Sequence, residues 1–345
     1  MSRHNSSRRA GFAGLTISLA AGALLVAPAP AHAGVLDTPT STAKVNLSHA
    51  GTCTHAGLAP DTLGTFLADG VPVQTSYSTT GTVTKTGDPS DVTTIATSLT
   101  STIKATQAGG ALKTVDVAAS FQSSWSAALG TAQTCNATVQ PAVTYTAALD
   151  LPTPRYVTMV VDAKHAIGAI QLVSASGILG GAVASATYGH GNGTQRTYVP
   201  AGTWQLVLQV SDQVKASTPT ATYPSSKAGS VTLHMSLDDP GSALTTTSGD
   251  GSKYLDLAAG RTCATGALTA TWKSKAGKGD DVKIKKAVFT VNGAKVATVK
   301  KPKKGKKTTL TGLDPDKTAE VSVTMKLVEK GAGKVTVERS YLPCT

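Results

Sequence analysis

The 345-residue chain has few aromatic residues (4%) and few charged residues (15%). Its only glutamates are Glu320, Glu329 and Glu338, so a pair of glutamates acting as general acid and base is excluded from the first 319 residues. The sequence also contains no nucleophile elbow, zinc-protease, P-loop or dinucleotide-binding motif. These absences point away from the common classes of enzyme, and we expect no catalytic activity and no cofactor.

Long apolar runs are missing after the first residues. Residues 1–33 combine Arg3, Arg8 and Arg9 with an apolar run over about 10–27 and an Ala31-His32-Ala33 cleavage site, which predicts a signal peptide. The apolar run is too short to span a bilayer, and no second one follows, so no transmembrane anchor is expected. The protein is predicted to be extracellular, either secreted or non-covalently associated with the cell surface. The sequence leaves open whether export uses the general secretory or the twin-arginine route.

Cysteine is scarce as well. Cys53 and Cys135 are separated by 82 positions, Cys263 and Cys344 by 81, and there are no others. In an exported chain an even number of cysteines indicates disulfides, and these spacings suggest the pairs Cys53–Cys135 and Cys263–Cys344 among three possible connectivities.

Basic residues are distributed unevenly. Residues 34–260 hold ten Lys and Arg against thirteen Asp, whereas residues 261–345 hold nineteen against seven acidic residues. The excess positive charge of the mature chain therefore lies in its last quarter, which indicates a separate basic domain there.

Alternating apolar residues predict strands almost throughout. From Val115 to Leu129 every odd position except Ser123 is apolar. Before this run, the apolar residues Ile95, Leu99, Ile103 and Ala105 also occupy odd positions, and Gly109-Gly110 separates the two runs as a hairpin turn would. The spacing of Ile95, Leu99 and Ile103 leaves a helix as the alternative. Residues 151–240 contain six further short runs of strand type.

The predicted fold is all-β, with tandem β-sandwiches. We expect a β-rich domain over 34–150 with one disulfide, a sandwich over 151–240, a linker over 241–253, and a basic domain over 254–345 with one disulfide. Whether 34–240 form one domain or two stays open. Seven short strands, with Asn292-Gly293 as a hairpin turn, make the last domain immunoglobulin-like.

Two resemblances add to this prediction. The runs Gly191-Asn192-Gly193-Thr194, Pro200 to Leu208 and Gly229 to Leu233 resemble the bacterial pre-peptidase C-terminal domain family, which implies an accessory binding module for this segment. The order of signal, small-residue sandwiches and a lysine-rich immunoglobulin-like end resembles uncharacterised secreted proteins of high-GC Gram-positive bacteria.

Several motifs have residues that could bind a metal or take part in catalysis, but a structural role explains each of them better. His49, Cys53 and His55 have the spacing of metal ligands, but a disulfide at Cys53 would remove its thiolate, and we expect no metal. Ser101-x-x-Lys104 has the spacing of penicillin-recognising enzymes, yet on a strand its two side chains point to opposite faces. The acidic turn at 314–320 lacks the full spacing of a calcium loop. Trp125, Trp204 and Trp272 are expected in the core rather than on a sugar-stacking surface.

Six lysines form the strongest candidate site. They surround Pro302 and Gly305 at the tip of an expected hairpin: Lys300, Lys301, Lys303, Lys304, Lys306 and Lys307. Such a cluster attracts anionic polymers, and for an exported protein these are polymers of the cell envelope. Sequence-specific binding of nucleic acid is not expected, because no aromatic residues alternate with the lysines. The competing explanation is that the lysines protect an exposed sheet edge.

The sequence therefore predicts a non-catalytic secreted or cell-surface binding or structural protein, tethered to anionic envelope polymers by its lysines. The alternative is a secreted hydrolase that uses Asp88, Asp91 and Asp116 of the first segment, with the other domains as accessories.

Overall fold

The computed structural model describes residues 36–49, 51–58, 61–108, 111–127, 135, 137–174, 176–185, 189–216, 226–273, 284–328 and 333–345. These residues form antiparallel strands and one short 3-10 helix, with no α-helix among them, so the prediction of an all-β protein is confirmed. The predicted signal peptide lies outside the described residues. In the described part of the chain, no helix has the length and apolar character needed to cross a membrane.

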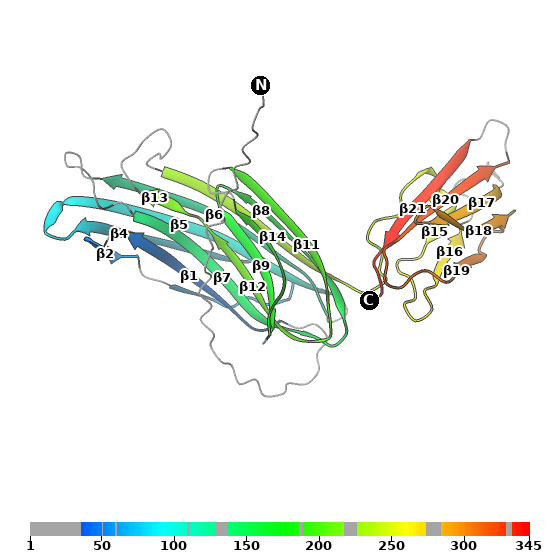
Figure 1. Ribbon diagram of the computed structural model, residues 1–345, viewed down its shortest axis with the longest axis horizontal. Helices are drawn as coiled ribbons and strands as arrows, with labels where there is room; N and C mark the ends of the chain where they lie inside the picture. The colour runs from blue at the N-terminus through cyan, green and yellow to red at the C-terminus, as the bar shows by residue number, and fades with distance from the viewer. Residues whose placement is uncertain are drawn as a thin grey trace, which may run out of the picture. The chain divides into compact units, whose positions relative to one another are not determined.

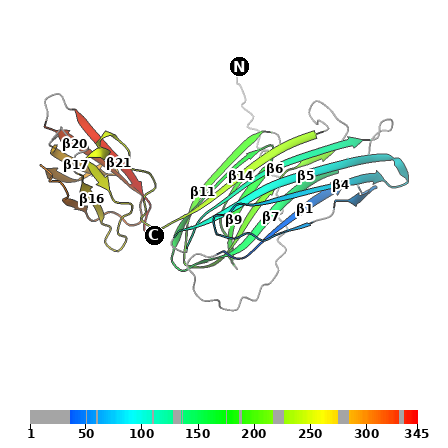
Figure 2. The same cartoon turned by 180° about the vertical axis from the view of Figure 1, so that it is seen from behind.

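Residues 36–238 build two seven-stranded sheets (Figure 1). The first sheet has the order β10 (Gly177–Ser185), β9 (Ile167–Ser174), β12 (Gly202–Ser211), β7 (Ala137–Leu151), β1 (Leu36–His49) and β3 (Asp61–Gly64), with β13 (Val214–Ala216) also paired to β7. The second sheet, which Figure 2 shows from the other side, has the order β11 (His190–Val199), β8 (Arg155–Lys164), β14 (Ser226–Asp238), β6 (Ala111–Ala127), β5 (Asp88–Ala108), β4 (Val73–Lys85) and β2 (Cys53–Gly57).

The segments before and after residue 150, for which the sequence left one domain or two open, are interleaved in the same sheets. Strand β7 from the first expected domain pairs with β12 from the second, and β14 from the second pairs with β6 from the first. One hydrophobic core contains residues from both segments, including Phe121, Tyr145, Leu172 and Leu233. Alternation shows which face of a strand is buried but not which strand lies beside it, so the sequence pattern could not reveal this interleaving.

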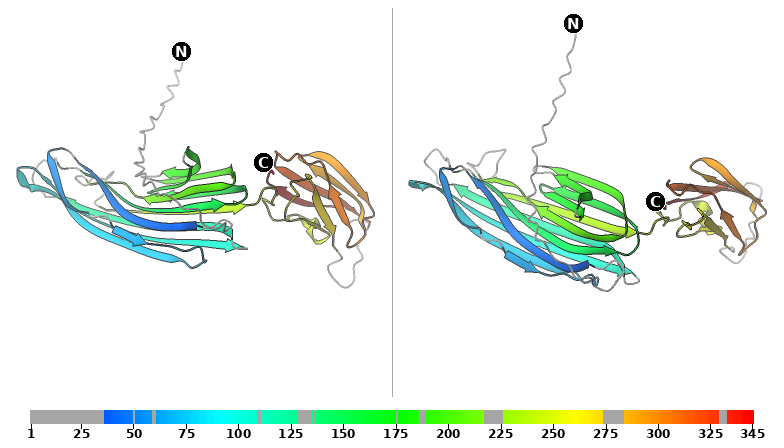
Figure 3. Two further views of the ribbon diagram at one scale, coloured as in Figure 1. Left: turned by 90° about the horizontal axis from the view of Figure 1, so that it is seen from below. Right: turned by 60° about the horizontal axis from the view of Figure 1, so that its bottom comes forward.

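The long strands follow the predicted alternation. Strand β5 runs for 21 residues and is paired along its length with β6, and the helix considered for residues 95–105 is not formed. Ala108 of β5 pairs with Ala111 of β6, and the Gly109-Gly110 turn expected between them lies outside the described residues. In Figure 3 the cyan strands β4 and β5 extend past the green strands toward one end of this sandwich.

Toward that end a second, smaller hydrophobic cluster includes Ile95, Trp125 and the Cys53–Cys135 disulfide, whose Cα atoms are 5.8 Å apart. Between the two clusters lies a layer of buried polar side chains. Thr97 and Ser123 are 3% and 1% exposed and share a hydrogen bond of 3.0 Å. Ser123, the exception in the predicted alternation, thus belongs to an internal polar layer.

Residues 242–345 form two further sheets around their own core. Three strands have the order β15 (Leu255–Leu257), β16 (Leu268–Trp272) and β19 (Lys307–Leu310), and four have the order β18 (Ala294–Lys300), β17 (Ile284–Val291), β20 (Ala319–Leu327) and β21 (Lys334–Tyr341). Trp272 and Phe289 meet edge to face in this core, with ring centroids 6.1 Å apart. The seven predicted strands are all present.

Two sequence features of this part are confirmed. Asn292 and Gly293 connect β17 to β18 with φ angles of 50° and 79°, the left-handed conformations of a two-residue hairpin turn. The Cys263–Cys344 disulfide joins the segment after the first strand, β15, to the segment after the last, β21.

The segment expected as a linker is instead hydrogen-bonded to its neighbours. Ser248 forms a bridge with Glu338 of β21, Ser242 forms one with Gly260, and η1 (Asp250–Lys253) follows. Gly251 is buried, and a Cβ atom there would lie 2.4 Å from the methyl carbon of Met325. Small residues without any periodicity therefore reflect close backbone packing at the edge of this core rather than a free linker.

Candidate functional site

Alternation gives the four-stranded sheet β18-β17-β20-β21 a buried face and an exposed face. On β20, Val321, Val323 and Met325 are buried in the core, while the side chains between them point outward. The exposed face carries residues of the other parity, and strand register determines which of them are neighbours.

Register places four lysines in one line across this exposed face. Lys300 of β18 pairs with Lys286 of β17, Lys286 pairs with Lys326 of β20, and Lys326 pairs with Lys334 of β21. All four residues are exposed. We call this set, one lysine from each strand, the lysine row. Since neighbouring strands lie about 4.8 Å apart, its backbone positions span on the order of 14 Å.

The lysine row is electrostatically unfavourable for the isolated protein. Like charges directly opposite on neighbouring strands destabilise a sheet. No ion pair within the described residues involves any of the four. Among the acidic residues that the structure describes, the nearest by register on this face is Glu338, which lies opposite Ser322, four residues along β20 from Lys326 and thus about 13 Å away.

The six lysines predicted from the sequence adjoin this row. Lys300 ends β18 and Lys307 begins β19, and these strands belong to different sheets, so the expected hairpin is wrong: the segment is a connection between sheets. The sequence pattern predicts a hairpin because two short strands flank a turn that contains Pro and Gly. We call Lys301, Lys303, Lys304, Lys306 and Lys307 the lysine loop, and all five are exposed.

Backbone hydrogen bonds hold the lysine loop against both sheets. The amide of Lys301 donates to the carbonyl of Lys285 at 3.2 Å, and the amide of Gly305 donates to the carbonyl of Trp272 at 2.8 Å. Gly305 has a φ of 72°, which suits glycine at the turn. Lys300 is both the end of the lysine row and the residue before the loop, so the two sets form one continuous basic surface.

Protection of a sheet edge explains only part of this surface. Lys300 and Lys334 lie on the edge strands β18 and β21, where charge blocks pairing with other chains. Lys286 and Lys326 lie on the central strands β17 and β20, which have no free edge. Sequence inspection missed Lys326 and Lys334 because each stands alone in the sequence; only cross-strand register aligns them with Lys286 and Lys300.

The other side chains on this face are small and uncharged next to the row. Thr298, Val288, Thr324 and Thr336 form the adjacent line, in the same strand order. Lysine offers a point charge on a flexible stem rather than the planar fork with which arginine grips a single carboxylate or phosphate. The surface therefore suits an extended ligand with many negative charges.

The candidate metal ligands His49, Cys53 and His55 lie around one end of a disulfide. Cys53 is oxidised in its disulfide, and Nε2 of His49 lies 3.1 Å from Nδ1 of His55. Within the described residues, no group of three His, Cys, Asp or Glu side chains is placed to hold a metal ion.

The aspartates of the alternative hydrolase do not converge. Asp91 is buried near the start of β5, whereas Asp116 lies on β6 opposite Lys104, thirteen residues further along β5 and thus on the order of 40 Å away. Asp88 is half-buried, and hydrogen bonds from Ser90 lower the pKa of its carboxyl group. Asp116 contacts Nδ1 of His234 at 2.6 Å on the surface.

Two further motifs have structural roles. Ser101 is buried and accepts a hydrogen bond of 2.8 Å from the hydroxyl of Tyr145, whereas Lys104 is exposed on the opposite face of β5. In the acidic turn, the carboxylate of Asp314 pairs with Lys317 at 2.8 Å and caps the amide of Asp316.

Two of the three tryptophans are confirmed as core residues. Trp125 and Trp272 are 6% and 3% exposed. Trp204 is half-buried against the larger core, and its indole nitrogen donates to the carbonyl of Pro200 at 3.2 Å.

A scan against protein-family models finds no match to the chain, and a search of curated proteins finds no match either. The lysine row and the lysine loop are therefore interpreted from their geometry alone.

Proposed function

We propose that this is an exported, non-catalytic binding protein whose basic C-terminal domain, immunoglobulin-like in type, holds it to anionic polymers of the cell envelope. The lysine row and the lysine loop together form the binding surface. The single observation that carries the proposal is the row itself, in which four lysines face one another across four strands with no ion-pair partner among the residues that the structure describes.

The electrostatic repulsion within the lysine row supports a role in binding. An unpaired charge opposite a like charge on a central strand lowers the stability of the sheet, so a binding partner of opposite charge relieves an existing repulsion. The lysines at positions 286 and 326 cannot be attributed to edge protection. Their alignment with the lysine loop gives a surface of nine lysines, which a linear polyanion can follow.

The type of ligand follows from the shape and chemistry of the surface. The row spans about 14 Å of an open sheet face, which exceeds the size of a single phosphate or carboxylate group. Repeating phosphates or carboxylates, as in envelope polymers, match a series of point charges. Sequence-specific reading of nucleic acid is not supported, since base recognition needs stacking or hydrogen-bonding side chains among the basic residues.

Export is consistent with the cysteine chemistry. Both pairs of cysteines are joined as disulfides and no free cysteine remains in the chain. Such bonds persist in oxidising compartments outside the cytosol. An extracellular location also brings the basic domain into contact with envelope polymers.

Co-sedimentation with purified cell envelopes over a series of salt concentrations tests the proposal. The mature full-length protein is compared with a row variant, in which Lys286, Lys300, Lys326 and Lys334 are changed to Ser. A matched control changes four exposed lysines of the larger sandwich to Ser: Lys44, Lys104, Lys164 and Lys215.

Wild type and control are expected to sediment with envelopes at low salt and to be released as salt screens the charges, while the row variant stays in solution. Equal sedimentation of the row variant and the control would show that net charge, rather than this surface, is responsible. That result would overturn the proposal.

A further inference from the structure

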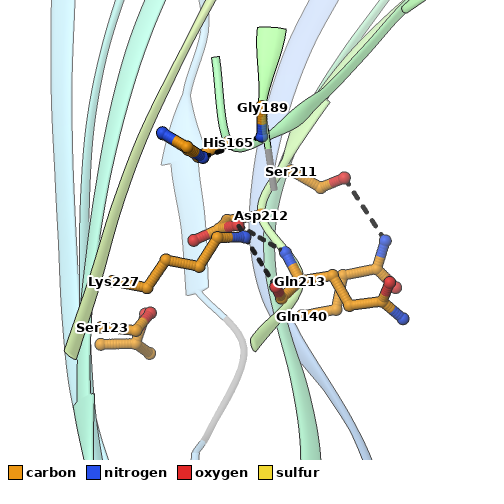
Figure 4. A network of polar contacts seen from close by, with 9 residues as sticks. Ser123, Gln140, His165, Gly189, Ser211, Asp212, Gln213 and Lys227 are labelled. Atoms are coloured by element: carbon orange, nitrogen blue, oxygen red, sulfur yellow. Dashed lines mark hydrogen bonds and ion pairs between the residues drawn. The ribbon is translucent and has the colours of Figure 1, made fainter. Parts of the chain in front are cut away.

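The larger sandwich contains a buried ion pair between its two sheets. Asp212 follows β12 in the first sheet, and Lys227 lies near the start of β14 in the second. Nζ of Lys227 is 2.5 Å from Oδ1 of Asp212, and the two side chains are 7% and 0% exposed. Figure 4 shows the two side chains pointing toward each other, with His165 nearby.

Both residues occupy positions that alternation assigns to the core. On the first sheet the inward positions run Leu206, Leu208, Val210 and then Asp212, and on the second they run Leu233, Val231, Gly229 and then Lys227. Their burial therefore follows from the strand pattern, and the pair lies in the polar layer beside Thr97 and Ser123, with Lys227 in register with Ser123.

Pro141 explains why the chain departs from the ladder here. Strands β12 and β13 pair with β7 in the same register, and the pairing is interrupted only at Asp212 and Gln213. At this point of β7 stands Pro141, which has no amide hydrogen to donate to the ladder. The amide of Asp212 still donates to the carbonyl of Pro141 at 3.0 Å. The carboxyl group is thus held at a fixed point inside the sandwich.

The two carboxyl oxygens of Asp212 differ in their surroundings. Oδ1 accepts hydrogen bonds from Lys227 and, at 2.7 Å, from the amide of Gln213. Oδ2 is buried and has no hydrogen-bond partner among the described residues. A buried carboxylate oxygen without a partner is costly, and burial is the main cause that raises the pKa of Asp212, against the opposing effect of Lys227.

The carbonyl of Gln213 accepts a second hydrogen bond from Nζ of Lys227 at 2.8 Å, which fixes the amine. Because a carbon–oxygen bond is about 1.2 Å long, a nitrogen 2.5 Å from Oδ1 lies within about 3.7 Å of Cγ, close to a reacting separation of about 3–3.5 Å. The site is shielded from water and brings an amine to a carboxyl group.

We propose that Lys227 and Asp212 join in an intramolecular isopeptide bond that cross-links the two sheets of the larger sandwich. Transfer of one proton from Nζ to Oδ2 converts the ion pair into a neutral amine and a carboxylic acid, which the dry interior favours. Nζ then attacks Cγ, and the amide of Gln213 stabilises the negative charge that develops on Oδ1.

The bond between Cγ and Oδ2 breaks, and this oxygen leaves as water with its own proton and one from the nitrogen. As the water leaves, the electron pair on Oδ1 restores the carbonyl, and the third proton of the original ammonium group stays on the amide nitrogen. The net reaction is amine plus carboxylic acid giving amide plus one water, without an oxidant or other co-reactant. Both charges and the unpartnered oxygen are removed together.

Intact-mass measurement of the exported, folded full-length protein, after reduction of its disulfides and denaturation, tests the proposal. The expected mass is lower by one water molecule than the mass calculated from the sequence of the exported chain with all cysteines reduced. Trypsin is expected not to cleave after Lys227, and fragmentation should identify one linked peptide that contains Asp212 and Lys227.

Lys227→Arg serves as the matched variant, because it keeps a cation beside Asp212 but lacks the primary amine, and it should show the full mass. Asp212→Ala should show it as well. A wild-type protein at full mass would overturn the proposal. A loss of water that persists in Lys227→Arg would do so too, since the loss would then arise elsewhere.

Discussion

Lys286 lies directly opposite Lys326 on the two central strands of the C-terminal four-stranded sheet, and Lys300 and Lys334 extend the same line to both edges. A repulsive contact at this position is not needed for solubility or edge protection, which the outer strands already provide. Binding of an anion to this exposed face would neutralise the repulsion, so we expect ligand binding to stabilise the sheet.

Replacing Lys326 with Gln is expected to stabilise the C-terminal domain at low salt. Removal of a like charge opposite Lys286 and Lys334 should raise the free energy of unfolding by about 0.2–1 kcal/mol, and the gain should shrink as salt screens the repulsion. Urea denaturation at low and high salt measures both effects.

Lys104 provides the control, because it lies opposite the acidic Asp116 on the neighbouring strand, so its charge is attracted rather than repelled. Lys104→Gln is expected to be neutral or slightly destabilising at low salt. If Lys326→Gln lowers stability as much as Lys104→Gln does, the lysine row is not under repulsion.

The Cys263–Cys344 disulfide closes a loop of 81 positions around the C-terminal core. Changing both cysteines to Ser should lower the free energy of unfolding of this domain by about 4 kcal/mol, since the chain-entropy contribution grows slowly with loop length. Thermal unfolding without reductant measures the loss. Cys344 is buried as well. An unfolding midpoint equal to that of wild type would contradict this prediction and would show that other contacts hold the segment after β21.

Tyr341 links stability to alkaline pH. Its ring is fully buried in the C-terminal core, its hydroxyl donates to the carbonyl of Ala258 at 2.9 Å, and burial raises the pKa of the phenol well above its usual value. The unfolded chain therefore loses this proton at lower pH than the folded one, and the stability contributed by Tyr341 falls as pH rises above about 10.

Tyr341→Phe should cost about 1 kcal/mol at neutral pH, through the lost hydrogen bond, and should lose less stability than wild type between pH 9 and about 11. Urea denaturation across this pH range distinguishes the two proteins. Parallel pH profiles would show that Tyr341 titrates normally.

The sequence predicts the strands of this protein well because alternation records which side of each strand is buried. Residues 115–127 and the Asn292-Gly293 turn are examples in which local pattern and local conformation agree. Pairing between strands distant in sequence leaves no such pattern. The pairing of β7 with β12 and of β6 with β14 is decided by packing of the whole sandwich, and for that reason the sequence left open whether residues 34–240 form one domain or two.

The candidate site divides in the same way. A run such as Lys300 to Lys307 is visible in the sequence. Lys326 and Lys334 are isolated in the sequence, and only strand pairing aligns them with Lys286 and Lys300. The buried pair of Asp212 and Lys227 did leave a signal, since each occupies a core position in an alternating run. Their meeting across the two sheets depends on which sheet each strand joins, and that information is not local.

Titration of a fluorescently labelled inorganic polyphosphate with the mature protein tests the central claim most directly. At low salt the row variant with Lys286, Lys300, Lys326 and Lys334 changed to Ser should bind more than about a hundredfold more weakly than wild type, since each lysine near an anionic surface contributes about 1 kcal/mol. The control with Lys44, Lys104, Lys164 and Lys215 changed to Ser should bind within a few-fold of wild type. Equal affinities of the two variants would contradict the account.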